Sequence, residues 1–297
     1  MPALHIFRRI LSGRRPIVAG PLSLLAAMPF VARPTSHVVT TPSAVVRAPL
    51  GDETSCDSPY AAPFGAGEKL DYSVKFGFIK AGQGSVEVVG RDTIRGREVW
   101  HTRFRVKGGV PMYKVDDVLE SWIDTGCFQS LRFVQQLEER GKTRERRIEM
   151  YPERLAFSEN DKPEERSAPR PLDDGSFFFF VRTQDLVVGE TYEFGQYFRP
   201  DRNPVVIRVI GRERVKVPAG EFDTIVLQPV IKTKGIFSEK GEARIWLTDD
   251  ASRVMVKMQA KVSFGTLTMS LTSVRHGAPP DQVIANAVDT RGSPCCS

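Results

Sequence analysis

Three pairs of adjacent aspartates are the side chains in this 297-residue sequence best suited to acid–base chemistry. Glycosidases and aspartic proteases both use two carboxylates held at a defined separation in a cleft. Neighbouring residues of a strand point to opposite faces, so an adjacent pair within a strand cannot supply that geometry. Aspartates in a turn such as "WLTDDASR" typically bond to their own backbone. The sequence therefore favours turn-making over a carboxylate-based hydrolase for Asp116–Asp117, Asp173–Asp174 and Asp249–Asp250.

Other catalytic and metal-binding patterns are missing from the sequence. Beyond residue 66 the only histidines are His101 and His276, which leaves little from which to build a zinc site or a Ser-His-Asp triad. There is no G-x-S-x-G elbow, no phosphate-binding loop and no dinucleotide-binding glycine fingerprint after a predicted strand. We therefore assign no catalytic residue, no metal site and no cofactor, and the sequence favours a binding role over an enzymatic one.

Four consecutive phenylalanines, Phe177–Phe180, form the most unusual apolar run in the sequence. The preceding Asp174, Gly175 and Ser176 supply a helix N-cap signal, and "FFFFVRTQDL" is long enough for about two to three turns before Gly189. A helix that is apolar nearly all round must be covered on more than one side. The run therefore predicts a short helix inside the molecule.

This helix has two interpretations. It could plug the concave face of a sheet and fill the core, or Phe177, Phe178, Phe179 and Phe180, together with Tyr197, could line a pocket for an acyl chain or another apolar ligand. A fully buried strand is a third possibility. The plug is favoured over the pocket because a large sheet with little helix needs something to cover it.

A charged hairpin is predicted at "EERGKTRERRIEM", residues 138–150, which carries charges on both strand faces. Such a hairpin projects into solvent. One interpretation is an interaction arm for an anionic partner or a lipid headgroup, formed by Lys142, Arg144, Arg146 and Arg147. The other, which we favour, is a solvated hairpin whose mixed charges protect an edge strand from unwanted pairing.

Strands with a period of two must position these residues. In "LDYSVKFGF" the side chains of Leu70, Tyr72, Val74, Phe76 and Phe78 share one face, which is typical of a half-buried strand. The alternation recurs later in the chain, and short turn signals such as "AGQG" and "VPAGEF" separate the segments. The pattern predicts an all-β domain built on one large curved antiparallel sheet, half-open or closed like a barrel, with one short interior helix; a two-sheet β-sandwich is the alternative.

The ends of the chain differ from this domain. Residues 1–32 have the order of a secretory signal, a basic stretch followed by "PIVAGPLSLLAAMPFVA", which is short and proline-interrupted for a membrane span. We predict a cleaved signal peptide at 1–32, a disordered linker at 33–66, a single β-rich domain at 67–275 and a disordered tail at 276–297. No transmembrane span is expected after cleavage.

The net charge and the cysteines of the sequence indicate which binding partners and which cellular compartment to expect. The formal net charge is +6, but residues 1–32 contribute four of these charges, which leaves +2 and argues against a nucleic-acid partner. The four cysteines fit an oxidising compartment but do not reveal their pairing; they are Cys56, Cys127, Cys295 and Cys296.

Residues 67–274 resemble the bacterial exported family known as domain of unknown function 3108. The resemblance rests on "GEKLDYSVKFGFIKAGQGSVEV", "DDGSFFFFVRTQDLVVGETYEF", "VKVPAGEFDTIVLQPV" and "GEARIWLTDDASRVMVKMQAKVSFGTLTMSL", which occur in the family's order. It implies an exported, β-rich protein of a Gram-negative-type bacterium, and no catalytic residue is carried over with it. The family's central segment usually has small and mixed aromatic residues where this chain has four phenylalanines.

Three functions follow, in decreasing order of support. The first is a periplasmic or envelope module that binds or carries an apolar or lipid-like ligand without catalysis. The second is a structural or assembly partner of other envelope proteins. The third is a carboxylate-based hydrolase.

Overall fold

The computed structural model describes residues 45–47, 62–110, 113–139, 142–231, 242–262 and 265–278. Nearly all of the regular structure is β. The strands are β1 (Val45–Arg47), β2 (Lys69–Phe76), β3 (Ile79–Ile94), β4 (Arg97–Val110), β5 (Tyr113–Asp124), β6 (Ser130–Glu139), β7 (Lys142–Tyr151), β8 (Ala156–Glu159), β9 (Glu165–Arg166), β10 (Thr191–Phe194), β11 (Val205–Val217), β12 (Gly220–Ile231), β13 (Glu242–Thr248), β14 (Met255–Val262) and β15 (Gly265–Arg275). Within these residues the helix α2 (Ser176–Phe180) leads directly into the 3₁₀ turn η2 (Val181–Thr183), and two further 3₁₀ turns are η1 (Pro152–Arg154) and η3 (Pro200–Arg202).

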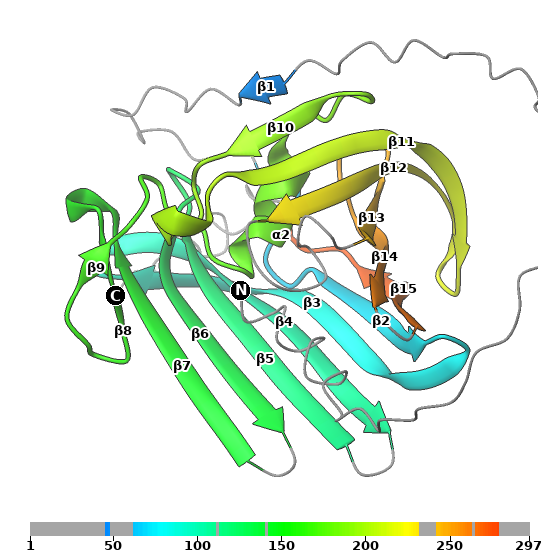
Figure 1. The fold of residues 1–297 in the computed structure, drawn as a ribbon, viewed down its shortest axis with the longest axis horizontal. Coiled ribbons are helices and arrows are strands. Elements are labelled where there is room, and N and C mark those ends of the chain that lie inside the picture. The colour runs from blue at the N-terminus through cyan, green and yellow to red at the C-terminus, as the bar shows by residue number, and fades with distance from the viewer. Residues whose placement is uncertain are drawn as a thin grey trace, which may run out of the picture.

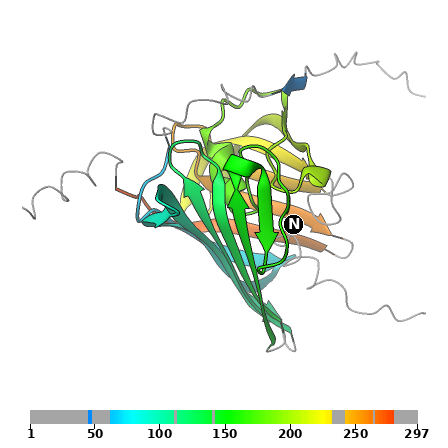
Figure 2. The same ribbon diagram turned by 90° about the vertical axis from the view of Figure 1, so that its left-hand side faces the viewer.

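These strands form one curved sheet in the order β1-β10-β11-β12-β13-β14-β15-β2-β3-β4-β5-β6-β7-β8-β9. Every neighbouring pair is antiparallel except β1 with β10. The long strands β3–β7 form one wall, β10–β12 curl over it, and α2 lies between them (Figure 1). Seen from the side, the ends of β4–β7 reach beyond the rest of the molecule (Figure 2). The predicted all-β fold with one large curved sheet and one short interior helix is confirmed, and the sheet is not divided into a sandwich.

The two ends of the sheet approach each other without forming a continuous ladder. The segment after β9 meets the segment after β10 at a single bridge between Leu172 and Tyr197. Three backbone hydrogen bonds accompany this bridge: the Leu172 N–H donates to the Gln196 carbonyl at 2.6 Å, Phe198 to Leu172 at 3.0 Å and Ala168 to Phe198 at 3.2 Å. The sheet is therefore the half-open form of the predicted architecture, with irregular backbone joining its ends.

The alternation of the sequence determines which face is buried. Leu70, Tyr72 and Val74 of β2 are each less than 5% exposed, whereas the intervening residues are half-exposed. The same period places Phe104 and Val106 of β4 and Leu119 of β5 in the core. Because side chains alternate between the two faces of a strand, the concave face holds the core and the convex face is polar.

One predicted turn was misplaced. The sequence suggested that Phe78 continues the buried face of a strand and that the chain turns at "AGQG", residues 81–84. Instead β2 pairs with β3 from Phe76 opposite Ile79, so the chain turns at Gly77 and Phe78. Gly77 takes the left-handed φ of +56° that this tight hairpin needs. The Phe78 side chain is consequently fully exposed, because it sits in the turn and not in the strand.

The linker predicted at 33–66 contributes to the fold at two places. Residues 45–47 pair with β10 as strand β1. Phe64 is 4% exposed and packs edge-on against Trp100 and Phe179, so the core includes residues just before Gly67. The predicted signal peptide, the rest of the linker up to residue 61, and the tail from residue 279 lie outside the described residues. Within the described ranges, no helix has the length and apolar character needed to cross a bilayer.

Candidate functional site

The phenylalanine run lies on the concave face of the sheet, and its four rings differ in burial. Phe179 and Phe180 are 2% and 6% exposed. The ring of Phe179 packs edge-on against Phe64 at 5.1 Å, and that of Phe180 packs edge-on against Phe194 at 5.2 Å. These two rings fill the core between the wall and β10. Phe179 and Phe180 therefore fill the core, as the plug interpretation of the helix expects.

Phe177 and Phe178, in contrast, are only half-buried. Phe178 stacks parallel to Phe104 of β4 with ring centroids 5.4 Å apart, and Phe177 packs edge-on against Phe180 at 5.9 Å. Each ring is anchored to the core on one side and keeps part of its surface accessible. Of the five residues predicted to line a ligand pocket, these two are the most exposed, and the pocket itself stays a prediction.

The helix begins at a buried polar cluster around Asp173, which is fully buried. Its Oδ1 accepts hydrogen bonds from the Gly175 and Ser176 backbone N–H groups at 2.8 and 2.9 Å and from the Ser121 hydroxyl at 2.7 Å. The N-cap position is Gly175, within the predicted signal, while the side-chain acceptor for the first N–H groups is Asp173, one residue before that signal. A Cβ on Gly175 would lie 2.5 Å from Ser121 Oγ, so only glycine lets the helix start this close to β5.

Asp174 and Tyr197 extend this cluster into the seam of the sheet. The Tyr197 hydroxyl donates to Asp174 Oδ1 at 3.3 Å, and both side chains are buried. Burial raises the pKa of Asp174, and burial together with the nearby Asp174 carboxylate raises the pKa of Tyr197. Tyr197 has no exposed surface, so in this structure it orders the seam and does not face a ligand.

Burial also raises the pKa of Asp173, to about 6, even though the hydroxyls of Ser130 and Ser121 favour its charged form. A carboxyl whose pKa is higher in the folded state than in the unfolded chain binds a proton on folding. Its stabilising contribution is therefore complete below the unfolded pKa and falls as pH rises toward about 6. The second oxygen of each aspartate, Oδ2 of Asp173 and of Asp174, is buried without a hydrogen-bond partner, which fits carboxyls that hold protons at acid pH.

We expect Asp173→Asn to remove this pH dependence. The rise in the pKa of Asp173 from 3.8 to about 6 corresponds to about 3 kcal/mol of stabilisation at low pH. This stabilisation is lost as the pH rises from about 4 to about 6. Asparagine keeps an acceptor for the Gly175 and Ser176 N–H groups but does not titrate. The free energy of unfolding can be measured in urea at pH 4 and at pH 7. From pH 4 to pH 7, the variant's free energy of unfolding should rise by about 2–3 kcal/mol relative to that of the wild type. A difference between the two proteins that is the same at both pH values would contradict the buried, proton-binding state of Asp173.

A buried ion pair fixes the far end of this helical segment. The Arg182 guanidinium donates to the two carboxylate oxygens of Glu68 at 2.6 and 3.0 Å, and its Nη2 also donates to the Ser252 carbonyl at 2.9 Å. The side chains of Arg182 and Glu68 are 3% and 5% exposed. One guanidinium thus connects three segments that carry the family resemblance. They are the starts of "GEKLDYS" and "VRTQDL" and the turn "TDDAS".

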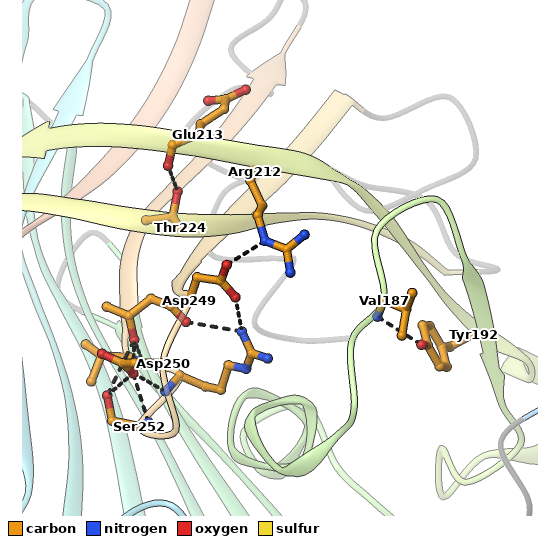
Figure 3. A network of polar contacts seen from close by, with 11 residues as sticks. Val187, Tyr192, Arg212, Glu213, Thr224, Asp249, Asp250 and Ser252 are labelled. Atoms are coloured by element: carbon orange, nitrogen blue, oxygen red, sulfur yellow. Dashed lines mark hydrogen bonds and ion pairs between the residues drawn. The ribbon is translucent and has the colours of Figure 1, made fainter.

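The other two aspartate pairs have structural partners. Asp249 binds Arg212 and Arg253 at 2.5 and 3.0 Å, and Asp250 accepts from the Ser252 backbone and hydroxyl at 2.9 and 2.6 Å, which closes the β13–β14 turn (Figure 3). The predicted turn-making role is confirmed for Asp250, whereas Asp249 forms ion pairs instead. Asp116 forms a two-point ion pair with Arg105 on the convex face at 2.7 Å, while its neighbour Asp117 is buried.

The residues of the predicted interaction arm lie on β7 and fall into two groups. Arg146 and Arg147 already have acidic partners: Arg146 donates to Glu159 at 2.6 Å, and Arg147 lies 2.8 Å from Glu149. Lys142 and Arg144 are exposed, and neither has an ion-pair partner among the residues that the structure describes. The hairpin is a continuation of the β4–β7 wall beyond the core and not a separate arm. The interaction arm stays a prediction, and Lys142 and Arg144 are the members without an acidic partner among the described residues.

The convex face carries a polar groove that the sequence did not reveal. It has a volume of about 460 Å³ and lies over β2, β3, β4 and β15. Four cationic side chains line it, Lys69, Lys80, Arg105 and Lys107, together with several hydroxyls and one carboxylate, Asp71. Its residues occupy the exposed positions of four separate strands. A sequence pattern could have found it only if the strand registers had been known.

Cys127 is buried and disulfide-bonded. The other three cysteines lie outside the described residues, so the pairing that the sequence left open stays open. In the described part of the chain, no group of three or more His, Cys, Asp or Glu side chains is arranged to hold a metal ion.

Comparison with known proteins gives a family and a fold. A family model described as "Protein of unknown function (DUF3108)" matches residues 71–272, well over half of the chain. The search of curated proteins found no match. A β-barrel-like protein of the domain of unknown function DUF1849 from Brucella abortus has a similar structure: the TM-score is 0.50 at 11% identity, and the match covers 73% of this chain and 100% of that one.

Two further solved structures match with lower TM-scores. A candidate lipoprotein from Parabacteroides distasonis has a TM-score of 0.29 at 13% identity, with 73% of this chain and 100% of that chain covered. A candidate exported protein with a YmcC-like fold from Bacteroides fragilis has a TM-score of 0.29 at 11% identity, with the same coverage. The similarity to the Brucella protein is at the level of the β-barrel-like fold.

Proposed function

Since the chain belongs to the DUF3108 family of proteins of unknown function, we propose from its own geometry that it is an exported, non-catalytic module that binds or carries an apolar or lipid-like ligand. One observation carries this proposal. Phe177 and Phe178 keep accessible ring surface, although they belong to an apolar helix inside a half-open sheet. Phe179 and Phe180 already fill the core at this point, so filling the core does not account for Phe177 and Phe178.

The surroundings of the two rings support an apolar ligand. Phe178 lies on Phe104, and the next side chains toward the sheet end on the same face are Val106 of β4, the buried Asp117 of β5 and Leu137 of β6. Val106 belongs to the apolar core and Leu137 packs against it, while Asp117 adds one polar group between them. Ligand sites are typically concave and mostly apolar with a few polar groups, and this face of the sheet offers that composition.

Two observations favour an exported, non-catalytic protein. The leader has the order of a secretory signal, and a disulfide at Cys127 fits an oxidising compartment such as the bacterial periplasm. The aspartates best suited to catalysis are engaged in other roles, since Asp173 and Asp174 are buried and Asp249 binds two arginines. A hydrolase would need carboxylates that a substrate can reach.

An acyl-chain probe tests this function. We expect a fluorescent fatty-acid analogue to bind the wild-type protein, and the double variant Phe177→Ser/Phe178→Ser to bind it at least about tenfold more weakly, because each substitution removes apolar contact area worth about 1 kcal/mol or more. Val187→Ser/Val188→Ser is a matched control, since these valines are 52% and 39% exposed and lie outside the apolar core. Equal binding by both double variants would contradict the proposed site.

A role as an envelope assembly partner is the second candidate, and the exposed pair Lys142 and Arg144 favours it. Both residues lie at the start of β7, next to the β6–β7 turn. If this role applies, Lys142→Ser/Arg144→Ser should lose co-purifying envelope proteins while acyl-probe binding is unchanged. Envelope proteins that still co-purify with this variant would contradict the assembly role.

A further inference from the structure

The tip of the β2–β3 hairpin exposes two large apolar side chains next to each other. Phe78 has 104% of its reference surface exposed and Ile79 has 63%. The turn is fixed in place, because the Gly77 N–H donates to the Thr266 carbonyl of β15 at 2.8 Å. An aromatic ring held in water by an ordered two-residue turn contributes nothing to the core, and adjacent exposed apolar residues are a feature of interaction sites.

Lysines flank this tip on both strands. Lys75 of β2 lies directly opposite Lys80 of β3, and both are exposed. Like charges directly opposite each other on neighbouring strands destabilise a hairpin. Neither lysine has an ion-pair partner among the residues that the structure describes. This pair of charges is therefore suited to an external anion.

The groove on the convex face begins at the same place. Lys80 and Lys107 line it, and Gln83, Ser85 and Thr272 add polar groups. Lys107 lies 3.4 Å from Asp116, and Asp71 accepts a hydrogen bond from Ser273 at 3.0 Å and lies 3.8 Å from Lys69. The groove thus offers Lys80 and several hydrogen-bond donors directly behind an apolar tip, which suits a phosphate-bearing headgroup.

Strand register places other exposed cations at this end of the sheet. Gly82 pairs with Gly108, and Gly108 pairs with Val115. Val115 in turn pairs with Glu139, and Glu139 pairs with Lys142, so the β2–β3 and β6–β7 turns lie at the same end of the strands. Lys142 and Arg144 therefore lie along the same rim of the curved sheet as Lys75 and Lys80, with β4, β5 and β6 between the two pairs.

We propose that this rim docks the protein on an anionic lipid bilayer, with Phe78 and Ile79 entering the boundary between headgroups and acyl chains and Lys75, Lys80 and the groove binding lipid phosphates. Aromatic and aliphatic side chains at a tip, with long cationic side chains just behind them, match the depth profile of a membrane interface. The inference does not depend on the proposed ligand site, which lies on the opposite face of the sheet.

Vesicle binding by the full chain tests this surface. We expect the protein to sediment with vesicles of phosphatidylglycerol and phosphatidylethanolamine, to bind phosphatidylcholine vesicles much more weakly, and to be released by salt. Phe78→Ser/Ile79→Ser should weaken binding at least about tenfold, and Lys75→Ser/Lys80→Ser should weaken it about tenfold and reduce its salt dependence. The urea midpoint should stay unchanged in the tip variant, because neither apolar side chain is buried.

The control is again Val187→Ser/Val188→Ser, which removes a similar exposed apolar pair elsewhere and should bind vesicles like the wild type. The variants differ from the wild type only at the substituted positions, so differences among them report those positions alone. Three results would each overturn the proposal: no binding of the wild type to anionic vesicles, equal binding to phosphatidylcholine vesicles, or full binding by the tip variant. The acyl-probe assay separates this outcome from the ligand-binding function, because the tip variant retains Phe177 and Phe178.

Discussion

Replacing Arg182 by methionine is expected to lower the free energy of unfolding by about 3–5 kcal/mol, because it leaves the Glu68 carboxylate buried without its partner. The guanidinium also donates to the Ser252 carbonyl, so the variant loses the link between the helical segment and the β13–β14 turn as well. For a domain of roughly 200 residues this corresponds to a fall in Tm of about 10 °C. Chemical unfolding in urea, followed by circular dichroism, measures the effect.

A double-variant cycle separates this ion pair from other losses at the site. Glu68→Met/Arg182→Met should be less destabilised than Arg182→Met, since two apolar side chains of similar volume can replace a buried ion pair at small cost. Lys261→Ala is the control, because the Lys261–Glu242 pair is 64% and 68% exposed and its loss should change stability by less than about 1 kcal/mol. A double variant that is as unstable as the sum of its two single variants would contradict the account of the pair.

Phe179→Ala is expected to cost about 3–5 kcal/mol of stability, whereas Phe177→Ala should cost only about 1–2 kcal/mol. The Phe179 ring is 2% exposed and contacts Phe64, so its removal leaves a cavity in the core. The Phe177 ring is half-buried, and less of its area is removed from water. Both substitutions lie in the same short helix and change helix propensity equally, so each is the control for the other.

Urea unfolding of the two variants measures this difference directly. Similar losses at both positions would mean that Phe177 is as much a part of the core as Phe179. In that case the accessible apolar surface on which ligand binding depends would not exist.

The sequence predicted the fold because its strongest signals are local. Alternation such as that of Leu70, Tyr72 and Val74 specifies a half-buried strand wherever it occurs, and an N-cap signal before an apolar run specifies a helix start. The same local argument failed at Phe78, which continues the alternation but lies in a turn, because a period of two cannot show where a strand ends. Only the pairing of Phe76 with Ile79 reveals that end.

The contacts of the candidate sites are non-local and so could not be predicted. Glu68 and Arg182 are 114 residues apart in sequence, and nothing in either segment shows that its charge is buried. Phe64 lies in a segment whose composition is typical of a linker, yet its ring packs against Phe179 of α2. The groove combines exposed positions of four strands, which the sequence can identify individually but cannot bring together.

The most direct test of the proposed function is native mass spectrometry of the protein purified without detergent from the periplasmic fraction of a bacterial host. The account predicts a bound apolar or lipid-like molecule, which organic extraction recovers from the wild type and which Phe177→Ser/Phe178→Ser lacks. A wild-type protein that has only the mass of its polypeptide, and that also fails to take up the acyl probe, would contradict the central claim that the half-buried rings of α2 form a ligand site.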